Sequence, residues 1–149
     1  DIDLAALERC SELRNLIAEL PGDKFVFTNG SAQHAANVCA KLGLDDLFNG
    51  VFDIVAADFK PKPHRVTYER FVETHNVDAA KAAMFEDIAH NLEAPYALGM
   101  KTVLIASDAV WIEDEPQHKR PASPEDDHSH VHHVTDDLKS FLKRLETAA

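Results

Sequence analysis

Short apolar segments alternate with amphipathic segments along the chain, and this alternation limits how the chain can fold. The apolar segments are typical of strands and span residues 24–27, 51–55, 82–85, 102–106 and 131–134. The amphipathic segments predict helices over residues 4–20, 32–42, 63–75 and 92–98, and a last helix capped by Asp136. Strands that alternate with helices pair in parallel through right-handed crossovers. The sequence therefore predicts an α/β fold, a Rossmann-like doubly wound parallel sheet in three α/β/α layers.

The length and charge of the chain indicate its size and its partners. Because a domain has about 150 residues, residues 1–149 are expected to form a single domain. Residues 112–127 are expected to form an acidic, proline-rich loop, to which we assign no function. Lys and Arg total 15 against 26 Asp and Glu, which gives a net charge of −11. This balance argues against nucleic-acid binding, which needs clustered basic residues, but a small phosphate needs only local positive charge or aimed N–H groups.

Two further features concern the cellular setting. No apolar run approaches the roughly 20 residues that a membrane-spanning helix needs, so no membrane partner is expected. Cys10 and Cys39 lie in helical patterns and form no Cys-x-x-Cys motif. They are expected to be buried thiols of a reducing compartment, which predicts a cytoplasmic protein.

Polar side chains follow three of the predicted strands. Thr28 and Asn29 come after the first strand, Lys62 lies in the loop after the second, and Glu86 and Asp87 come after the third. In a parallel α/β sheet, ligands bind outside the carboxyl ends of the strands. The layout therefore directs these five residues to one edge of the sheet.

The first two groups suit an anion. The Thr28 hydroxyl, with the N–H groups of Gly30 and Ser31 at a helix start, makes an oxyanion cradle; the alternative is a plain turn followed by an N-cap. Lys62, held between two prolines, is a fixed point charge suited to phosphate, although a solvated loop lysine is the commoner case. Lys60 is a competing candidate, but Lys62 is nearer the start of the following helix.

The acidic pair suits a hard cation. Glu86 and Asp87 are adjacent and repel each other, and Mg²⁺ relieves such repulsion because it takes one or two carboxylates plus substrate phosphate. The alternative is that the two acids face a helix N-terminus or solvent. Asn91 is ambiguous, because it suits either a supporting position beside the metal or the N-cap of the next helix.

A histidine-rich segment follows the acidic loop. It contains His128, His130, His132 and His133, and neutral imidazoles bind zinc or nickel. A strand over residues 131–134 would point His130 and His132 to one side and His133 to the other. Since no cysteine or further ligand spacing accompanies them, a structural or adventitious role is favoured.

The ordered set Thr28-Asn29, Lys62-Pro63 and Glu86-Asp87 with Asn91 resembles motifs II, III and IV of the haloacid-dehalogenase (HAD) superfamily. Longer strings resemble its pyrimidine 5′-nucleotidase-like branch, and the likeness covers nearly the whole chain. These strings are Phe27-Thr28-Asn29-Gly30, Pro61-Lys62-Pro63 followed by Tyr68, Met84-Phe85-Glu86-Asp87 with Asn91-Leu92, Leu98-Gly99-Met100, and His133-Val134-Thr135-Asp136-Asp137-Leu138.

The resemblance implies a Mg²⁺-dependent phosphatase that forms an aspartyl-phosphate. Its substrate would be a small phosphorylated metabolite, with a pyrimidine nucleoside 5′-monophosphate as one candidate. Thr28 would hydrogen-bond the transferring phosphoryl group, and Asn29 would support that group or the substrate. Lys62 would neutralise charge between nucleophile and phosphate. The resemblance also implies that Asp87 binds Mg²⁺ with help from Glu86, and that Asn91 positions the loop.

The first family motif, DxDx(T/V), supplies the nucleophile and the general acid/base. Asp1-Ile2-Asp3 mimics its two aspartates but lacks the Thr or Val and a preceding strand. It better matches the segment leading out of the helical cap, so we expect an incomplete, carboxyl-terminal core that lacks the nucleophile and most of the cap. Two alternatives remain: a non-catalytic HAD-like module that binds phosphate, metal or a protein partner, and a phosphorylation-receiver domain. The receiver order, with acids early and lysine last, differs from the order here.

Overall fold

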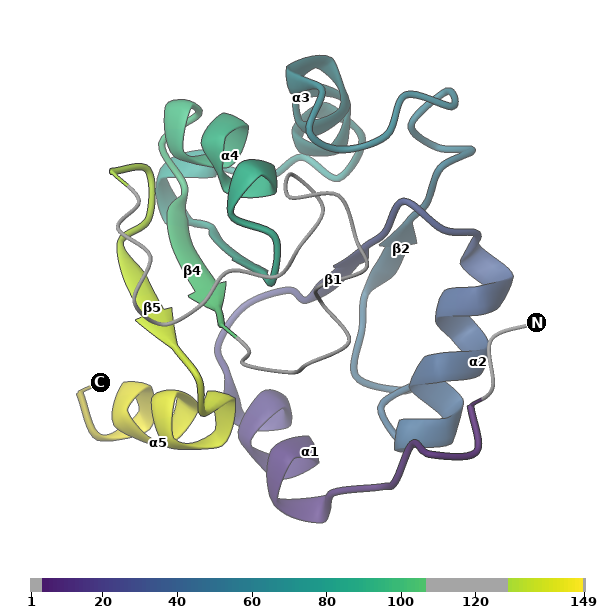
Figure 1. Cartoon of the computed structure of the whole chain (residues 1–149), viewed down its shortest axis with the longest axis vertical. Coiled ribbons are helices and arrows are strands. Elements are labelled where there is room, and N and C mark those ends of the chain that lie inside the picture. The colour runs from purple at the N-terminus through teal and green to yellow at the C-terminus, as the bar shows by residue number, and fades with distance from the viewer. Residues whose placement is uncertain (1–3, 107–128, 149) are drawn as a thin grey trace. The chain divides into compact units, whose positions relative to one another are not determined.

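The computed structural model describes residues 4–106 and 129–148, which form two compact units (Figure 1). Of the described residues, 4–60 and 139–148 belong to unit 1, and 61–106 and 129–138 belong to unit 2. The predictions for Asp1, Asp3, His128 and the loop over residues 112–127 lie outside the described residues. Each unit is described by itself.

Unit 1 contains a two-stranded parallel sheet with helices from both ends of the chain. Its elements are α1 (Ser11–Glu19), β1 (Phe25–Phe27), α2 (Ala32–Leu42), β2 (Gly50–Phe52) and nearly all of α5 (Leu138–Ala148). Val26 of β1 is in register with Val51 of β2. The rings of Phe27 and Phe52 meet edge to face with centroids 5.0 Å apart, and Phe52 is fully buried. This aromatic contact joins the ends of the two strands.

The apolar faces of α1 and α5 are partly buried, and Leu145 of α5 is 40% exposed. Leu16 of α1 and Phe141 and Leu142 of α5 are among the buried residues of unit 1. Glu12 of α1 also pairs with Lys139 and with Lys143 of α5. The first and last helices of the chain therefore belong to the same unit.

Both ends of α2 match the prediction. The Ser31 hydroxyl accepts a hydrogen bond from the N–H of His34 and caps the start of the helix. Gly43 ends it with a φ of 72°, a left-handed conformation that favours glycine. The signals for this helix are local, so the sequence alone was sufficient to predict them.

Unit 2 contains a three-stranded parallel sheet in the order β3-β4-β5. Its elements are α3 (Arg65–Thr74), η1 (Ala79–Lys81), β3 (Ala83–Glu86), η2 (Ala89–Leu92), α4 (Glu93–Ala97), β4 (Lys101–Ile105) and β5 (His133–Thr135). Leu92 and Leu104 are fully buried at the centre of its core, with Met84, Ala89 and Val131 packed against them. The central strand β4 is buried from Thr102 to Leu104, as the run predicted over residues 102–106 implies, while Lys101 at its start is exposed.

Several predicted boundaries were wrong. The first helix begins at Ser11 rather than near residue 4, and the last begins at Leu138, so Asp136 is not next to its first residue. The strand predicted over 131–134 covers His133–Thr135 instead. Cys10 and Cys39 are free thiols but half-buried rather than buried.

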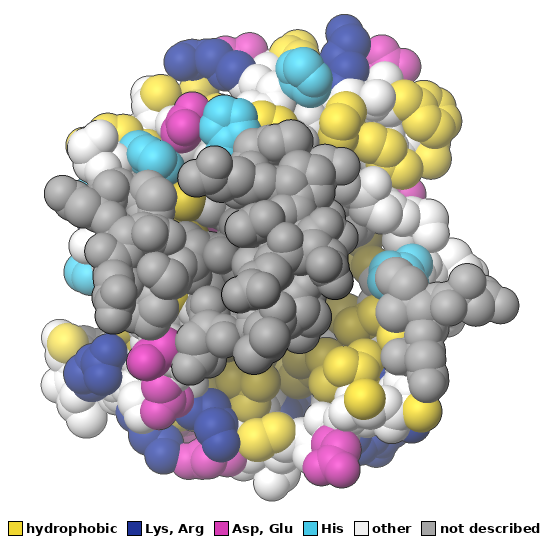
Figure 2. Space-filling model, in the orientation of Figure 1, with side chains coloured by type: hydrophobic (Ala, Val, Ile, Leu, Met, Phe, Trp, Pro, Cys, Tyr) yellow, Lys and Arg dark blue, Asp and Glu magenta, His cyan; other side chains and the backbone are white. Residues whose placement is uncertain are grey.

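The second strand ends at Phe52, three residues earlier than predicted. The Asp53 carboxylate accepts a hydrogen bond of 2.9 Å from the N–H of Ala56 and so turns the chain. The turn continues through Asp58 and Phe59, which have φ values of 55° and 58°. Val55 and Phe59 are consequently 59% and 70% exposed, and Figure 2 shows hydrophobic side chains at the surface beside charged ones.

The α/β class with parallel strand pairing is confirmed. The strands pair in two sheets, one in each unit, where the sequence predicted one. Within residues 4–106 and 129–148, every helix is too short or too polar to span a membrane.

Candidate functional site

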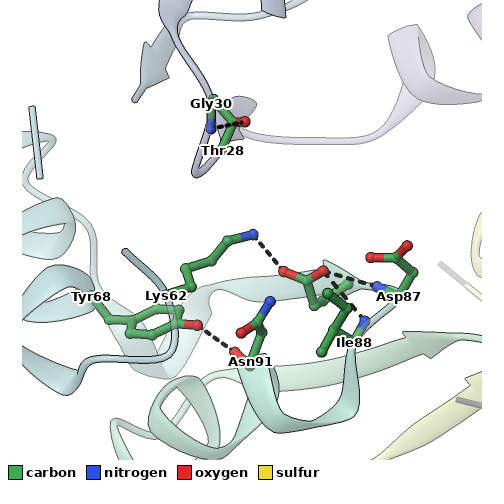
Figure 3. A network of polar contacts seen from close by, with 8 residues as sticks. Thr28, Gly30, Lys62, Tyr68, Asp87, Ile88 and Asn91 are labelled. Carbon is green, nitrogen blue, oxygen red and sulfur yellow. Dashed lines mark hydrogen bonds and ion pairs between the residues drawn. The ribbon is translucent and has the colours of Figure 1, made fainter. Parts of the chain in front are cut away.

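Lys62 and Glu86 form an ion pair in unit 2, and this pair is the centre of the candidate site (Figure 3). Lys62 Nζ lies 2.5 Å from Glu86 Oε2, and the two side chains are 10% and 8% exposed. Lys62 comes from the proline-flanked segment before α3, and Glu86 is the last residue of β3. A buried charge is stable only when it is paired and hydrogen-bonded, so each of these side chains depends on the other. Lys60, the competing candidate, is exposed.

The second oxygen of Glu86 holds the turn that follows β3. Glu86 Oε1 accepts hydrogen bonds from the N–H groups of Asp87, at 3.1 Å, and Ile88, at 3.4 Å. Both carboxylate oxygens therefore have partners, one a cation and the other the backbone. The sequence predicted Glu86 as a metal ligand beside Asp87 and did not predict that it would orient both Lys62 and the turn.

The two adjacent carboxyl groups differ in acidity. Burial, together with the hydrogen bond and the charge of neighbouring Glu86, raises the pKa of Asp87 to about 6. Burial also opposes ionisation of Glu86, but the hydrogen bond with Asp87 and the Lys62 ammonium outweigh it and hold the pKa of Glu86 below its usual value. Of these two carboxylates, Asp87 is thus the one whose negative charge the surrounding protein compensates less.

The donor chemistry of this pair fits Mg²⁺. Both residues offer carboxylate oxygens, and the Asp87 carboxylate would be stabilised by a nearby cation. Among the described residues, no three His, Cys, Asp or Glu side chains come together as a metal cage. Mg²⁺ is usually held by one or two carboxylates with water and substrate phosphate, and this pair supplies carboxylates of that kind.

Asn91 lies in η2 and is 6% exposed. Its backbone carbonyl accepts a hydrogen bond of 2.6 Å from the hydroxyl of Tyr68, which is fully buried in α3 (Figure 3). The interpretation of Asn91 as the N-cap of the next helix was wrong, because the N-cap of α4 is Leu92. Burial and the charges of Glu86 and Glu93 raise the pKa of Tyr68 well above its usual value, so the phenol stays protonated as a donor. The sequence analysis missed this bond, although the inward helical position of Tyr68 was a signal.

The histidines that the structure describes have partners within unit 2. His130 Nε2 lies 2.8 Å from the carbonyl of Ala89. His132 Nδ1 accepts a hydrogen bond of 3.0 Å from the N–H of Thr102. These contacts tie the segment before β5 to η2 and β4, as a structural role predicts.

In unit 1, Thr28 and Gly30 form a tight turn at the end of β1. Thr28 Oγ1 accepts a hydrogen bond of 3.0 Å from the N–H of Gly30 (Figure 3), and Ile54 donates one of 3.1 Å to the Gly30 carbonyl. A Cβ at position 30 would lie 3.3 Å from Thr28 Oγ1, which explains why glycine suits this position. The Gly30 N–H is thus used inside the turn, as in the plain-turn alternative. A hydroxyl oxygen that accepts in this way still has its own proton to donate to an anion. Asn29, between them, is exposed.

The sequence analysis also missed Asp53, which fixes the start of α2. Asp53 Oδ2 accepts a hydrogen bond of 3.0 Å from the N–H of Ala32, while Oδ1 accepts the bond from Ala56. The backbone hydrogen bonds from Ala56 and Ala32 lower the pKa of Asp53. The acidic residue after β2 was visible in the sequence, but its hydrogen bond from the N–H of Ala32, 21 positions away, is a long-range contact.

Comparison with known proteins identifies the class. The family model described as haloacid dehalogenase-like hydrolase matches residues 6–99, a range that contains Thr28, Lys62, Glu86, Asp87 and Asn91 but not the histidine-rich segment. The chain belongs to this family of hydrolases. The superfamily resemblance is therefore confirmed, while the pyrimidine 5′-nucleotidase-like branch remains a prediction.

Curated relatives include enolase-phosphatase E1 of Pseudomonas aeruginosa strains LESB58 and PAO1, both 28% identical over 97 residues. These matches cover 63% of this chain and 42% and 38% of the relatives, so the matched part spans about two fifths of their length.

Solved structures with a similar fold include L-2-haloacid dehalogenase from Xanthobacter autotrophicus with chloropropionic acid covalently bound. It is 18% identical, with a TM-score of 0.70 over 93% of this chain and 61% of that chain. The UTR4 protein of Saccharomyces cerevisiae is 16% identical, with a TM-score of 0.62 over 87% of this chain and 55% of that one. At these identities the likeness concerns the fold, and it confirms the Rossmann-like class.

Proposed function

We propose that this chain is the phosphate- and metal-binding part of a Mg²⁺-dependent phosphohydrolase that acts on a small phosphate ester through an aspartyl-phosphate. A nucleoside 5′-monophosphate remains the candidate substrate, and the cytoplasm the candidate location. The similarity to enolase-phosphatases supports a phosphate ester as the substrate class.

The observation that carries the proposal is the arrangement of Lys62, Glu86 and Asp87. A buried lysine is held against one carboxylate of an adjacent acidic pair, and the other carboxylate has a raised pKa. Phosphoryl transfer needs charge-neutralising groups in fixed positions, since catalysis there is mostly positioning and electrostatic stabilisation. An oriented ammonium and a carboxylate suited to a cation supply both kinds of group.

Each residue then has a role. Asp87, assisted by Glu86, would hold Mg²⁺, which supplies positive charge to the phosphate oxygens when bound. Lys62 neutralises charge on the phosphoryl group, and Asn91 keeps the loop after β3 in place. From unit 1, we propose that Thr28 donates its hydroxyl proton to a phosphoryl oxygen, with Asn29 and the turn at Gly30 supporting it.

We assign the phosphoryl-accepting aspartate to a segment outside these 149 residues, because Asp1-Ile2-Asp3 lacks the Thr or Val of the family motif. The prediction is that the 149-residue chain binds Mg²⁺ without turnover, whereas the natural gene product that contains it hydrolyses an aryl phosphate.

The test is hydrolysis of p-nitrophenyl phosphate by the natural gene product, with Mg²⁺ and after chelation. Asp87→Asn and Lys62→Ala should each lower kcat/KM by about a hundredfold or more. Asp87→Asn weakens the hold on the cation, and Lys62→Ala removes a positive charge that neutralises the phosphoryl group. The matched controls are Asp78→Asn and Lys81→Ala, which alter an exposed pair in the same unit with 58% and 85% exposed side chains. These controls should stay within about twofold of the wild type.

Three results would contradict the proposal. They are unchanged activity in Asp87→Asn, hydrolysis that survives complete metal removal, and turnover of L-2-chloropropionate in place of phosphate esters. Mg²⁺ binding by the natural gene product without turnover of any phosphate ester would instead favour the non-catalytic module.

A further inference from the structure

Tyr68 makes a buried hydrogen bond that none of the proposed catalytic roles uses. Its side chain is fully buried, and its hydroxyl lies 2.6 Å from the backbone oxygen of Asn91. The phenol proton is thus directed at a carbonyl of the protein itself. A fully buried side chain does not contact a substrate, and the Asn91 carbonyl links Tyr68 to the loop after β3.

The bond completes a clamp on the segment between Glu86 and Asn91. At one end, Lys62 Nζ holds Glu86 at 2.5 Å. At the other end, Tyr68 holds the Asn91 carbonyl. Lys62 and Tyr68 come from one short stretch of chain, the segment leading into α3 and its first turns. This stretch therefore holds the loop after β3 at both ends.

Asp87 lies inside the clamped segment. Its N–H is bonded to Glu86, so the position of its backbone depends on the first clamp. The 3-10 helix η2 begins two residues further on, at Ala89, and ends next to Asn91 at Leu92. If the Asn91 carbonyl lost its donor, it would be a buried polar group without its bond, and η2 would rearrange or open to recover one.

We propose that Tyr68 is a positioning residue that sets the backbone of residues 87–91 and so makes Asp87 competent to bind the divalent cation. The inference rests on the proposed function for the identity of the ligand, a divalent cation. The contacts that form the clamp are observed in the structure and are independent of that function. Tyr68 acts through the Asn91 carbonyl and takes no part in the chemical step.

The test compares Tyr68→Phe with Tyr96→Phe in the 149-residue chain. These are the two tyrosines of the sequence, and Tyr96 is 43% exposed, so it is a matched control for loss of one phenolic hydroxyl. Backbone hydrogen exchange of residues 87–92 in metal-free protein should be about tenfold faster in Tyr68→Phe and unchanged in Tyr96→Phe. Mn²⁺ binding, followed by electron paramagnetic resonance, should weaken about fivefold in Tyr68→Phe alone.

The natural gene product provides the second readout. With Tyr68→Phe, the Mg²⁺ concentration for half-maximal hydrolysis of p-nitrophenyl phosphate should rise about fivefold, while kcat at saturating Mg²⁺ stays within about twofold of the wild type. A fall in kcat at saturating metal, with exchange unchanged, would overturn the inference. Unchanged exchange and unchanged metal binding would overturn it as well.

The outcomes separate this inference from the proposed function. Faster exchange and weaker Mn²⁺ binding in a protein that hydrolyses no phosphate ester would support the clamp and reject the phosphatase. If Tyr68→Phe fails to fold, proton NMR of the wild type decides. A hydroxyl proton of Tyr68 protected from solvent exchange, with a cross-relaxation peak to the amide of Leu92, supports the bond, and its absence contradicts it.

Discussion

Unit 1 and unit 2 carry their candidate residues in chemically different ways. In unit 2, Lys62 and Glu86 are opposite charges, 10% and 8% exposed, and each depends on the other. In unit 1, Thr28 and Gly30 form an uncharged turn, joined by one hydrogen bond between a hydroxyl and a backbone N–H. Asn29, between them, is exposed.

The difference concerns what each arrangement contributes to folding. Removing one partner of a buried ion pair leaves an uncompensated charge, which is strongly destabilising. Removing one half-buried hydroxyl loses a single ordinary hydrogen bond. We therefore expect changes in the charged group of unit 2 to lower both stability and activity, and changes in the turn of unit 1 to lower activity with little loss of stability.

The largest expected effect on stability is that of Lys62→Met. Methionine keeps much of the side-chain volume but removes the ammonium, so the Glu86 carboxylate stays buried without its cation, although the hydrogen bonds from Asp87 and Ile88 remain. We expect the free energy of unfolding to fall by about 3 kcal/mol at pH 7, measured by urea denaturation of the 149-residue chain.

The control for this variant is Lys81→Met. Lys81 Nζ lies 3.7 Å from Asp78 Oδ2 in a pair with 85% and 58% exposed side chains. Exposed ion pairs contribute about 0–1 kcal/mol to the free energy of unfolding, so this change should have little effect on stability. Equal losses in the two variants would remove the contrast between buried and exposed charge on which the comparison rests.

Thr28→Val should lower the activity strongly and the stability only slightly. Valine has the shape of threonine without its hydroxyl, so the proposed hydrogen bond to the phosphoryl group is lost. We expect kcat/KM of the natural gene product to fall about tenfold to a hundredfold, with the free energy of unfolding lower by about 1 kcal/mol or less. Thr28→Ser restores the hydroxyl and should recover most of the activity. A serine variant as slow as the valine variant would show that the methyl group, and not the hydroxyl, matters.

The parts of the fold that the sequence predicted depend on local signals. The Ser31 cap, the Gly43 stop and the apolar strand β4 each follow from a few neighbouring residues. The parts that it mispredicted depend on contacts between distant residues. Ile54 and Val55 are apolar enough to extend β2, but Asp53 accepts the N–H of Ala56, three residues on, and that of Ala32, 21 positions away, and the strand ends before it.

The candidate site follows the same rule. The acidic pair after β3 and the lysine between two prolines were visible as residue types in order. The Lys62–Glu86 bond links residues 24 positions apart, and the Tyr68–Asn91 bond links residues 23 apart. A single sequence does not state which lysine faces which carboxylate, so the members of the site could be predicted but their pairing could not.

The smallest expected effect concerns Asp53, a carboxylate of unit 1 that accepts hydrogen bonds from the N–H groups of Ala32 and Ala56. Its pKa is lowered by the hydrogen bonds from Ala56 and Ala32. A carboxyl group whose pKa is lowered in the folded state stabilises the fold at pH values above its unfolded-state pKa, near 3.8. This contribution is lost as the pH falls through the folded-state pKa. Asp53 should therefore stabilise unit 1 at pH 7 and cease to do so in strong acid.

Asp53→Asn tests this predicted direction of the pH dependence. The asparagine oxygen can accept one of the two N–H groups, but its NH₂ group would face the other, so the variant should be less stable than the wild type at pH 7. The difference in free energy of unfolding from the wild type should be smaller than that of Lys62→Met. It should disappear as the pH falls below 3.8 toward 2. Urea denaturation at several pH values measures it, with Asp23→Asn, an exposed acid of the same unit, as the control. If the difference in free energy of unfolding between the two proteins is the same at pH 2 as at pH 7, Asp53 acts through its shape rather than its charge. Neither unit 1 turn would then depend on a charge for its stability.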